Sequence, residues 1–172
     1  FRPMGAADAE GASALEAACF EGAGHEAWTP GMFLSELGED VAAPRSWWVA
    51  HDDGQLLGLA GGMVVDGDVQ ILDVAVDPKH RREGIARKLL SHVSYDAQML
   101  GCTTASLEVE DGNEGAIALY ASLGFTEAGC RRGYYGVGKD AIVMTAPLPL
   151  VLPVDNASPE PTAAEQRVWP LP

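Results

Sequence analysis

The feature that most constrains this chain is a basic loop between a buried strand and an amphipathic helix. Five of its eleven Lys and Arg residues fall within the ten positions 79–88. The apolar run Ile71–Val76 before them predicts a buried strand, and the apolar spacing after them predicts a helix over 85–100. A helix that begins at such a loop presents unpaired N–H groups and the positive end of its dipole. The segment therefore predicts an anion site, with a solvated basic turn as the alternative.

Two small residues in this loop favour the anion site. Gly84 has no side chain and Ala86 has a short one, so a phosphate could approach the backbone closely. The basic side chains around them would add positive charge.

The rest of the chain is acidic, with a net charge of −14 over 172 residues. Nucleic-acid binders recognise phosphates through basic surfaces, so this charge argues against a nucleic-acid partner. A negative surface steers positive ligands inward and favours a cationic partner, although solubility alone would also account for it. Hydrophobic residues make up 47% of the chain and charged residues 21%, which indicates a globular domain with a substantial core.

Other whole-chain signals exclude some classes of protein. No apolar stretch is long enough to span a bilayer and no secretory signal opens the chain, so we expect a cytoplasmic protein without a membrane partner. The start at Phe1 suggests a trimmed or partial N-terminus. The three cysteines and four histidines have no metal-ligand spacing, so we expect reduced thiols and no metal. The oligomeric state stays open.

Local signals predict the order strand, helix, helix, three strands, helix, strand, helix, two strands. We expect Asp8 to cap the first helix, with Leu15, Ala18 and Cys19 on its inner face. Thr29 should cap the second helix and Pro30 should open it. Its inward side chains are predicted to be Phe33, Leu34 and Leu37. The predicted strands cover 2–4, 46–51, 56–65, 70–76, 104–110, 125–135 and 141–146. This order indicates an α+β or mixed α/β fold around a central sheet.

The character of the chain changes at Pro147. Seven of the eleven prolines lie in 147–172, among Asn, Ser, Thr and acidic residues. We therefore expect one domain over 1–146 and a Pro-rich C-terminal tail over 147–172.

Several motifs together resemble one enzyme family. Arg81–Ala86 is similar to the acetyl-CoA loop of the GNAT superfamily, patterned Gln/Arg-x-x-Gly-x-Gly/Ala. More of residues 1–146 resembles the bacterial ribosomal-protein-alanine N-acetyltransferases within it. The matching stretches are Phe33–Leu37, Val74–Pro78, Leu107–Val109, Asn113 with Ala116–Tyr120, Leu123–Phe125, Arg132–Tyr135 and Asp140–Met144.

This resemblance implies a GNAT fold, a mixed central sheet flanked by helices whose splayed strands hold acetyl-CoA. The loop amides would hold the pyrophosphate, and the strand before the loop would pair with the pantetheine amides. Asn113 would serve as both helix cap and cofactor contact, with a cap alone as the alternative. The implied cofactor residues are Val74, Ala75, Val76, Arg81, Arg82, Glu83, Gly84, Ile85, Ala86, Arg87 and Asn113.

The resemblance also implies two catalytic residues. Glu108 matches the family's proton acceptor, and Tyr120 matches the donor that protonates the leaving thiolate. Desolvation at the opening of the sheet could raise a carboxyl pKa from about 4.3 toward neutrality. A solvated strand carboxylate and a core tyrosine are the respective alternatives.

One departure from the family pattern concerns the acceptor. The family usually has Arg-x-Ser-Asn where this chain has Glu110-Asp111-Gly112-Asn113. Glu108 and Glu110 lie two apart on a strand and share a face, so we expect Glu110 to raise the pKa of Glu108 and to make the cleft more anionic.

The resemblance predicts acetyl transfer from acetyl-CoA to the N-terminal α-amine of a protein by direct attack. The partner would be a basic N-terminus, as on a ribosomal protein. An α-amine of pKa near 8 needs roughly 1.4 kcal/mol to be neutral at pH 7, whereas a lysine needs roughly 4.6 kcal/mol. The alternatives are a lysine or small-amine acetyltransferase, a non-catalytic acyl-CoA-binding module, and a scaffolding subunit.

Overall fold

The computed structural model describes residues 1–20, 27–38 and 41–151. These form a seven-stranded sheet in the order β1-β2-β3-β4-β5-β7-β6. The strands are β1 (Arg2–Pro3), β2 (Arg45–Asp52), β3 (Gln55–Val65), β4 (Asp68–Val76), β5 (Thr104–Glu110), β6 (Thr126–Arg131) and β7 (Ala141–Pro147). The helices are α1 (Ala9–Phe20), α2 (Pro30–Glu36), α3 (Ile85–Met99) and α4 (Glu114–Ser122), with short 3-10 turns η1 (Ala6–Asp8) and η2 (Pro78–His80). The predicted order of elements and the mixed, helix-flanked sheet are confirmed.

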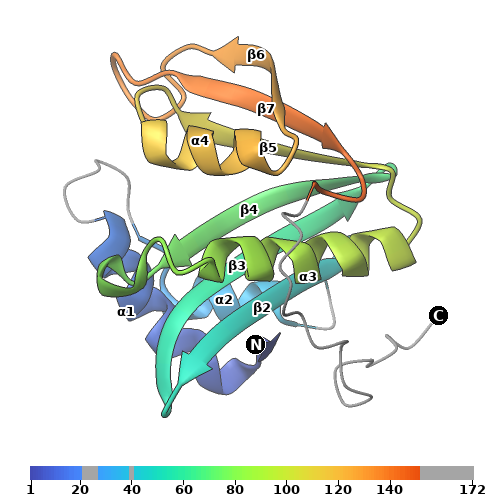
Figure 1. The fold of residues 1–172 in the computed structure, drawn as a ribbon. Coiled ribbons are helices and arrows are strands. Elements are labelled where there is room, and N and C mark those ends of the chain that lie inside the picture. Colours follow the sequence, from blue (N-terminus) through green and yellow to red (C-terminus); the bar gives the residue numbers. More distant parts are fainter. Residues whose placement is uncertain (21–26, 39–40, 152–172) are drawn as a thin grey trace.

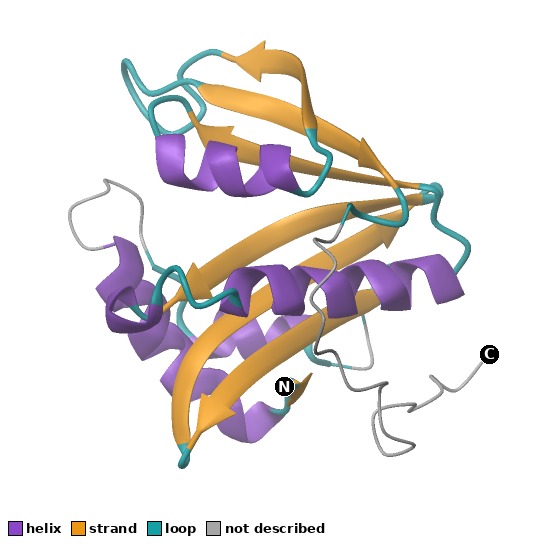
Figure 2. Cartoon of the chain, in the orientation of Figure 1, coloured by secondary structure: helices purple, strands orange, loops and turns teal. Residues whose placement is uncertain are grey.

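Helices cover both faces of the sheet. Helices α1 and α2 lie behind β2–β4 in Figure 1, and α3 crosses the front of these strands. Helix α4 packs on the part of the sheet formed by β5, β7 and β6, as Figure 2 also shows. The α3 stripe is confirmed at Leu89, Leu90, Val93 and Ala97, which are fully buried, whereas Leu100 at the end of the predicted helix is 36% exposed.

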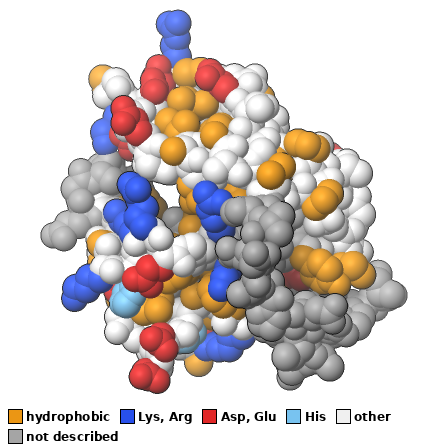
Figure 3. Space-filling model, viewed as in Figure 1, with side chains coloured by type: hydrophobic (Ala, Val, Ile, Leu, Met, Phe, Trp, Pro, Cys, Tyr) orange, Lys and Arg blue, Asp and Glu red, His pale blue; other side chains and the backbone are white. Residues whose placement is uncertain are grey.

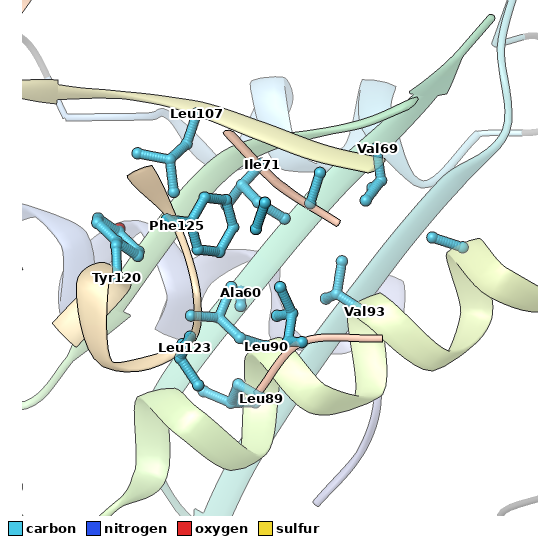
Figure 4. Close-up of a cluster of buried hydrophobic side chains, with 14 of the residues drawn as sticks. Ala60, Val69, Ile71, Leu89, Leu90, Val93, Leu107, Tyr120, Leu123 and Phe125 are labelled. Carbon is cyan, nitrogen blue, oxygen red and sulfur yellow. The ribbon is translucent and has the colours of Figure 1, made fainter. Parts of the chain in front are cut away.

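Two hydrophobic clusters hold these layers together. The larger one lies under α3 and α4 (Figure 4) and includes Leu90, Leu107 and Phe125. The smaller one joins α1 and α2 to the opposite face, with Phe33 and Trp47 at its centre. Each fully buried side chain of this size contributes about 2–3 kcal/mol to folding.

Strands β4 and β5 pair along only part of their length. They run parallel, and the pairing is confined to Asp68–Gln70 against Thr104–Ser106. Beyond these residues the strands diverge, so the sheet opens between them (Figure 1). The other edge of β4 stays paired with β3 up to Val76. The sheet is therefore open along the edge of β4 that faces β5, while the edge that faces β3 stays paired.

A β-bulge lies in β4 at the start of this opening. Gly62 pairs with Ile71, but the next residue of β3, Gly61, pairs with Asp73, which leaves Leu72 as the extra residue. A bulge bends its strand and re-aims the side chains that follow it. Ile71 accordingly packs in the cluster under α3, whereas Ala75 packs in the cluster of α1 and α2.

Some local predictions are confirmed. The Thr29 hydroxyl accepts a hydrogen bond from the Met32 N–H at 3.3 Å, and Pro30 is the first residue of α2. The Asn113 side chain accepts from the Ala116 N–H at 3.2 Å and caps α4.

Others are wrong. Asp8 belongs to η1 and accepts from the Gly5 N–H at 2.8 Å, so it does not cap α1. Leu34 is 45% exposed, because α2 is short and Phe33 takes the inward position. Ala18 is also exposed. Strand β6 ends at Arg131, because the chain turns at Gly133.

The first residues beyond the expected domain boundary pack against the domain. Strand β7 includes Pro147, and Leu150 is buried in the cluster under α3. The Val151 N–H donates to the Leu123 carbonyl at 3.0 Å. The remainder of the expected tail, 152–172, lies outside the described residues.

Candidate active site

The opening between β4 and β5 forms a cavity of about 1020 Å³. Strand β4 supplies one wall, and β5 and α4 supply the other. The start of α3 and its preceding loop line one end, and Cys19 of α1 reaches the same end, because its Sγ and the Arg81 Nε both donate to the Val76 carbonyl. Figure 3 shows Lys and Arg side chains gathered around the hollow between the two halves of the molecule. The cavity is large enough for an extended cofactor together with an acceptor group.

The loop between β4 and α3 is shaped as an anion site. Gly84, directly before α3, has φ +82°, a left-handed conformation that an L side chain rarely adopts. The loop is tied back to the strand because the Arg81 Nε donates to the Val76 carbonyl at 3.3 Å. Gly84 and the first residues of α3, Ile85 and Ala86, line the cavity together with Arg81 and Arg82. This arrangement suits a phosphate.

Arg87 connects the two sides of this end of the cavity. Its guanidinium donates to the Ser122 hydroxyl on α4 at 2.9 Å. One cation in the first turn of α3 thus reaches α4.

The cavity edge of β4 offers backbone groups. Residues Val74, Ala75 and Val76 pair with β3 on one side, and no described strand pairs with them on the other. An extended ligand with amide groups could continue the sheet at this edge, as a strand would.

Two carboxylates face the cavity from β5. Glu108 forms an ion pair with Arg131 at 3.3 Å, and Glu110 forms one with Lys139 at 3.2 Å. Both side chains are 29% exposed. Glu108 and Glu110 therefore share a face of β5, as predicted. Each carboxylate is paired with its own cation, which comes from β6 for Glu108 and from the segment before β7 for Glu110. These cations offset the repulsion expected between the two acids.

Two tyrosines line the same cavity as Glu108. Tyr120 on α4 is buried, and desolvation raises its pKa above the ordinary value, with the charge of Asp73 acting in the same direction. Its phenol is therefore neutral and carries a proton to donate. Tyr135 donates a hydrogen bond from its hydroxyl to the Glu108 carbonyl at 3.1 Å, and burial raises its pKa to about 12. This hydrogen bond holds β5 in place near its C-terminal end.

Comparisons with known proteins decide the family. The family model described as "Acetyltransferase (GNAT) family" matches residues 10–125. The chain belongs to the GNAT acetyltransferase family. It is 36% identical over 124 residues to the [ribosomal protein bS18]-alanine N-acetyltransferase of Escherichia coli K12, covering 70% of this chain and 81% of that protein. It is 38% identical over 144 residues to N-alpha-acetyltransferase RimI of Mycobacterium tuberculosis, covering 80% and 85%.

Solved structures agree with this family assignment. The crystal structure of the ribosomal-protein-S18-alanine N-acetyltransferase from Escherichia coli superposes with a TM-score of 0.71 at 31% identity, covering 91% of this chain and 96% of that one. The chain is therefore an acyltransferase of the GNAT fold, as its motifs predicted.

The acetyltransferase brings nearly all predicted site residues together around the cavity. They are Val74, Ala75, Val76, Arg81, Arg82, Gly84, Ile85, Ala86, Arg87, Glu108, Asn113 and Tyr120. Glu83 does not line the cavity; its carboxylate lies 3.4 Å from the His80 ring, and its side chain is 55% exposed. The roles of these residues stay predictions.

Sequence reasoning missed several residues that line the same cavity. Glu16 and Cys19 come from α1, and Asp73 comes from β4. An acid within the apolar run Ile71–Val76 is a signal that could have identified Asp73. Burial raises the pKa of Asp73 to about 8, and the charge of Glu16 acts in the same direction. Burial also raises the pKa of the Cys19 thiol, whose Sγ donates to the Val76 carbonyl at 3.2 Å.

Two classes of feature are absent from the part of the chain that the structure describes. None of its helices is long and apolar enough to cross a membrane. It also holds no group of three or more His, Cys, Asp or Glu residues arranged to bind a metal ion.

Proposed function

We propose that this acetyltransferase transfers the acetyl group of acetyl-CoA to the N-terminal α-amine of a protein, of the ribosomal-protein alanine type. The observation that carries the proposal is one continuous cavity that the basic loop before α3, Glu108 and Tyr120 all line. The relative at 36% identity is named a [ribosomal protein bS18]-alanine N-acetyltransferase, and the relative at 38% identity is named an N-alpha-acetyltransferase.

The residues of the cavity suit binding of acetyl-CoA. The start of α3, with Arg81 and Arg82, would hold the pyrophosphate. The open edge of β4 at Val74–Val76 would pair with the pantetheine amides. These contacts would lead the thioester toward the wall formed by β5 and α4.

Direct attack by the amine accounts for the remaining groups. Glu108 would accept a proton from the acceptor nitrogen as the new C–N bond forms. Tyr120 would donate its proton to the sulfur as the C–S bond breaks, and its raised pKa keeps that proton available. Cys19 is no candidate for a covalent intermediate, because its raised pKa and its hydrogen bond to the Val76 carbonyl keep it in the thiol form.

An α-amine is the acceptor that this chemistry favours. Its ammonium form needs about 1.4 kcal/mol to become neutral at pH 7, roughly a third of what lysine needs. The overall charge of −14 would draw a basic N-terminus toward the enzyme.

The test uses two lysine-containing peptides that start with Ala, one with a free and one with a formylated α-amine. Each is incubated with acetyl-CoA and the full chain, and mass spectrometry locates the acetyl group. We expect acetylation of the free α-amine and little reaction of the formylated peptide. Acetylation confined to the lysine in both peptides, or no transfer by an enzyme that binds acetyl-CoA, would overturn the proposal.

A further inference from the structure

The gap between β4 and β5 has a closed end. The two strands pair only over Asp68–Gln70 and Thr104–Ser106, at the start of each strand. Ile71 and Leu107 are the next residues of the two strands, and both line the cavity. They are 8% and 3% exposed, and their side chains lie near Phe125 in the larger hydrophobic cluster (Figure 4). These two side chains therefore stand where the cavity meets the paired part of the strands.

The other end of the gap is where the cofactor enters under the proposed function. The loop that suits a phosphate follows Val76, the last residue of β4, and ends at Gly84. A cofactor that is held there by its pyrophosphate and paired along Val74–Val76 extends backward along β4, toward Ile71. Its thioester end therefore points at the closed end of the gap.

The groups proposed for the chemistry leave this direction for the acyl chain. Glu108 and Leu107 are adjacent on β5, so their side chains point to opposite faces of the sheet. Leu107 packs in the cluster under α3 and α4, to which Tyr120 also belongs. The amine, which must reach Glu108, and the sulfur, which must reach Tyr120, therefore lie on opposite faces. The acyl chain lies between them, in the plane of the gap, and points toward Ile71 and Leu107.

The space left for that chain is short. From Glu108 to Ser106, where the pairing with β4 begins, is two residues, which span about 7 Å along a strand. The Leu107 side chain fills part of this length, and Ile71 limits it from the facing strand. Buried side chains are closely packed and give way little, so each further methylene of an acyl chain must displace one of them.

We propose that Ile71 and Leu107 form the end wall of the acyl site and select acetyl over longer acyl groups. This inference rests on the proposed function for the direction of the cofactor and for the roles of Glu108 and Tyr120. It goes beyond that function because it names the residues that choose the acyl group.

The test compares acetyl-CoA, propionyl-CoA and butyryl-CoA as donors for the full chain. The acceptor is the lysine-containing Ala peptide with a free α-amine, and mass spectrometry of the product gives kcat/KM for each thioester. Ile71→Val and Leu107→Val each shorten one side chain by a methylene. The control Leu90→Val makes the same change at a fully buried residue of the same cluster that does not line the cavity. Each ratio of kcat/KM comes from one protein sample, so it does not depend on how much of that sample is folded.

We expect the wild type to use propionyl-CoA about 10- to 200-fold less efficiently than acetyl-CoA, which is the discrimination that one methylene gives in an apolar pocket. Butyryl-CoA should be poorer still. Ile71→Val and Leu107→Val should each raise the propionyl-to-acetyl ratio about fivefold or more, because each makes room for part of the longer chain. Leu90→Val should keep the wild-type ratio, because it makes room away from the acyl site.

A wild type that uses propionyl-CoA as well as acetyl-CoA would overturn the end wall, and so would Val variants whose ratios match that of Leu90→Val. Failure of the proposed function gives a different result. If only the lysine of the peptide is acetylated, the same ratios are measured on that lysine. If no amine reacts, calorimetry supplies the ratios as affinities. Propionyl-CoA should then bind the wild type more weakly than acetyl-CoA, and a difference that Ile71→Val and Leu107→Val leave unchanged would overturn the end wall.

Discussion

Replacing Asp73 by Asn should stabilise the protein, and the gain should grow with pH. Burial raises the pKa of Asp73 from 3.8 to about 8, a difference of about four units (8 − 3.8 ≈ 4). The unfolded chain releases this proton above about pH 4, whereas the folded chain keeps it until about pH 8. The folded state binds more protons in that interval, so the free energy of unfolding falls by up to about 1.4 kcal/mol per pH unit.

The size of the effect follows from this slope. Three pH units, from pH 5 to pH 8, give an upper limit of roughly 4 kcal/mol. Entry of water and small movements of the wall reduce that limit, so we expect about 2–4 kcal/mol. Asn has no proton to lose, so Asp73→Asn lacks this decline. The difference in unfolding free energy between the variant and the wild type should therefore increase by that amount between pH 5 and pH 8.

Urea unfolding followed by circular dichroism at pH 5, 6, 7 and 8 measures this difference. Asp66→Asn serves as the control, because Asp66 is exposed in the turn between β3 and β4 and its φ of +50° suits Asn. The control should follow the wild type at every pH. Parallel stability curves for Asp73→Asn and the wild type would refute the reasoning, because they would mean that Asp73 titrates alike in the folded and unfolded chains.

Three further predictions concern the cofactor loop, the proposed base and the packing of the C-terminal segment. Gly84→Glu should weaken CoA binding about tenfold or more in calorimetry. The control Gly67→Glu, which is equally strained with φ +81°, should leave CoA binding unchanged. Equal effects of the two substitutions would show that the pyrophosphate does not bind at the start of α3. Glu108→Gln should lower kcat by about 10²–10⁴ with CoA affinity unchanged, and near-normal turnover would exclude Glu108 as the base. Leu150→Ala should cost about 2–5 kcal/mol in urea unfolding, against less than about 0.5 kcal/mol for the exposed Val151→Ala; similar small losses would contradict the packing of this segment.

Much of the fold could be predicted because its signals are local. A cap bonds to an N–H two or three residues away, as Thr29 and Asn113 do. The α3 stripe depends on a repeat of 3.6 residues, which the chain carries whatever it packs against. Where a second layer decides burial, local reasoning failed. The exposure of Leu34 depends on where α2 meets the sheet, and no neighbour in the chain encodes that.

In the candidate site, too, some features follow from local sequence and others depend on tertiary structure. The sequence by itself determined the basic loop, the strand before it and the helix after it, because adjacent residues build all three. It also carried the motifs by which the family was recognised. Only the tertiary structure decided that Arg131 pairs with Glu108 and that Lys139 pairs with Glu110, since each pair joins separate parts of the chain. Only the β-bulge in β4 and the placement of α1 brought Asp73 to the cavity wall beside Glu16, residues 57 positions apart (73 − 16 = 57). A buried charge depends on what surrounds it in space, and the order of residues along the chain does not specify those surroundings.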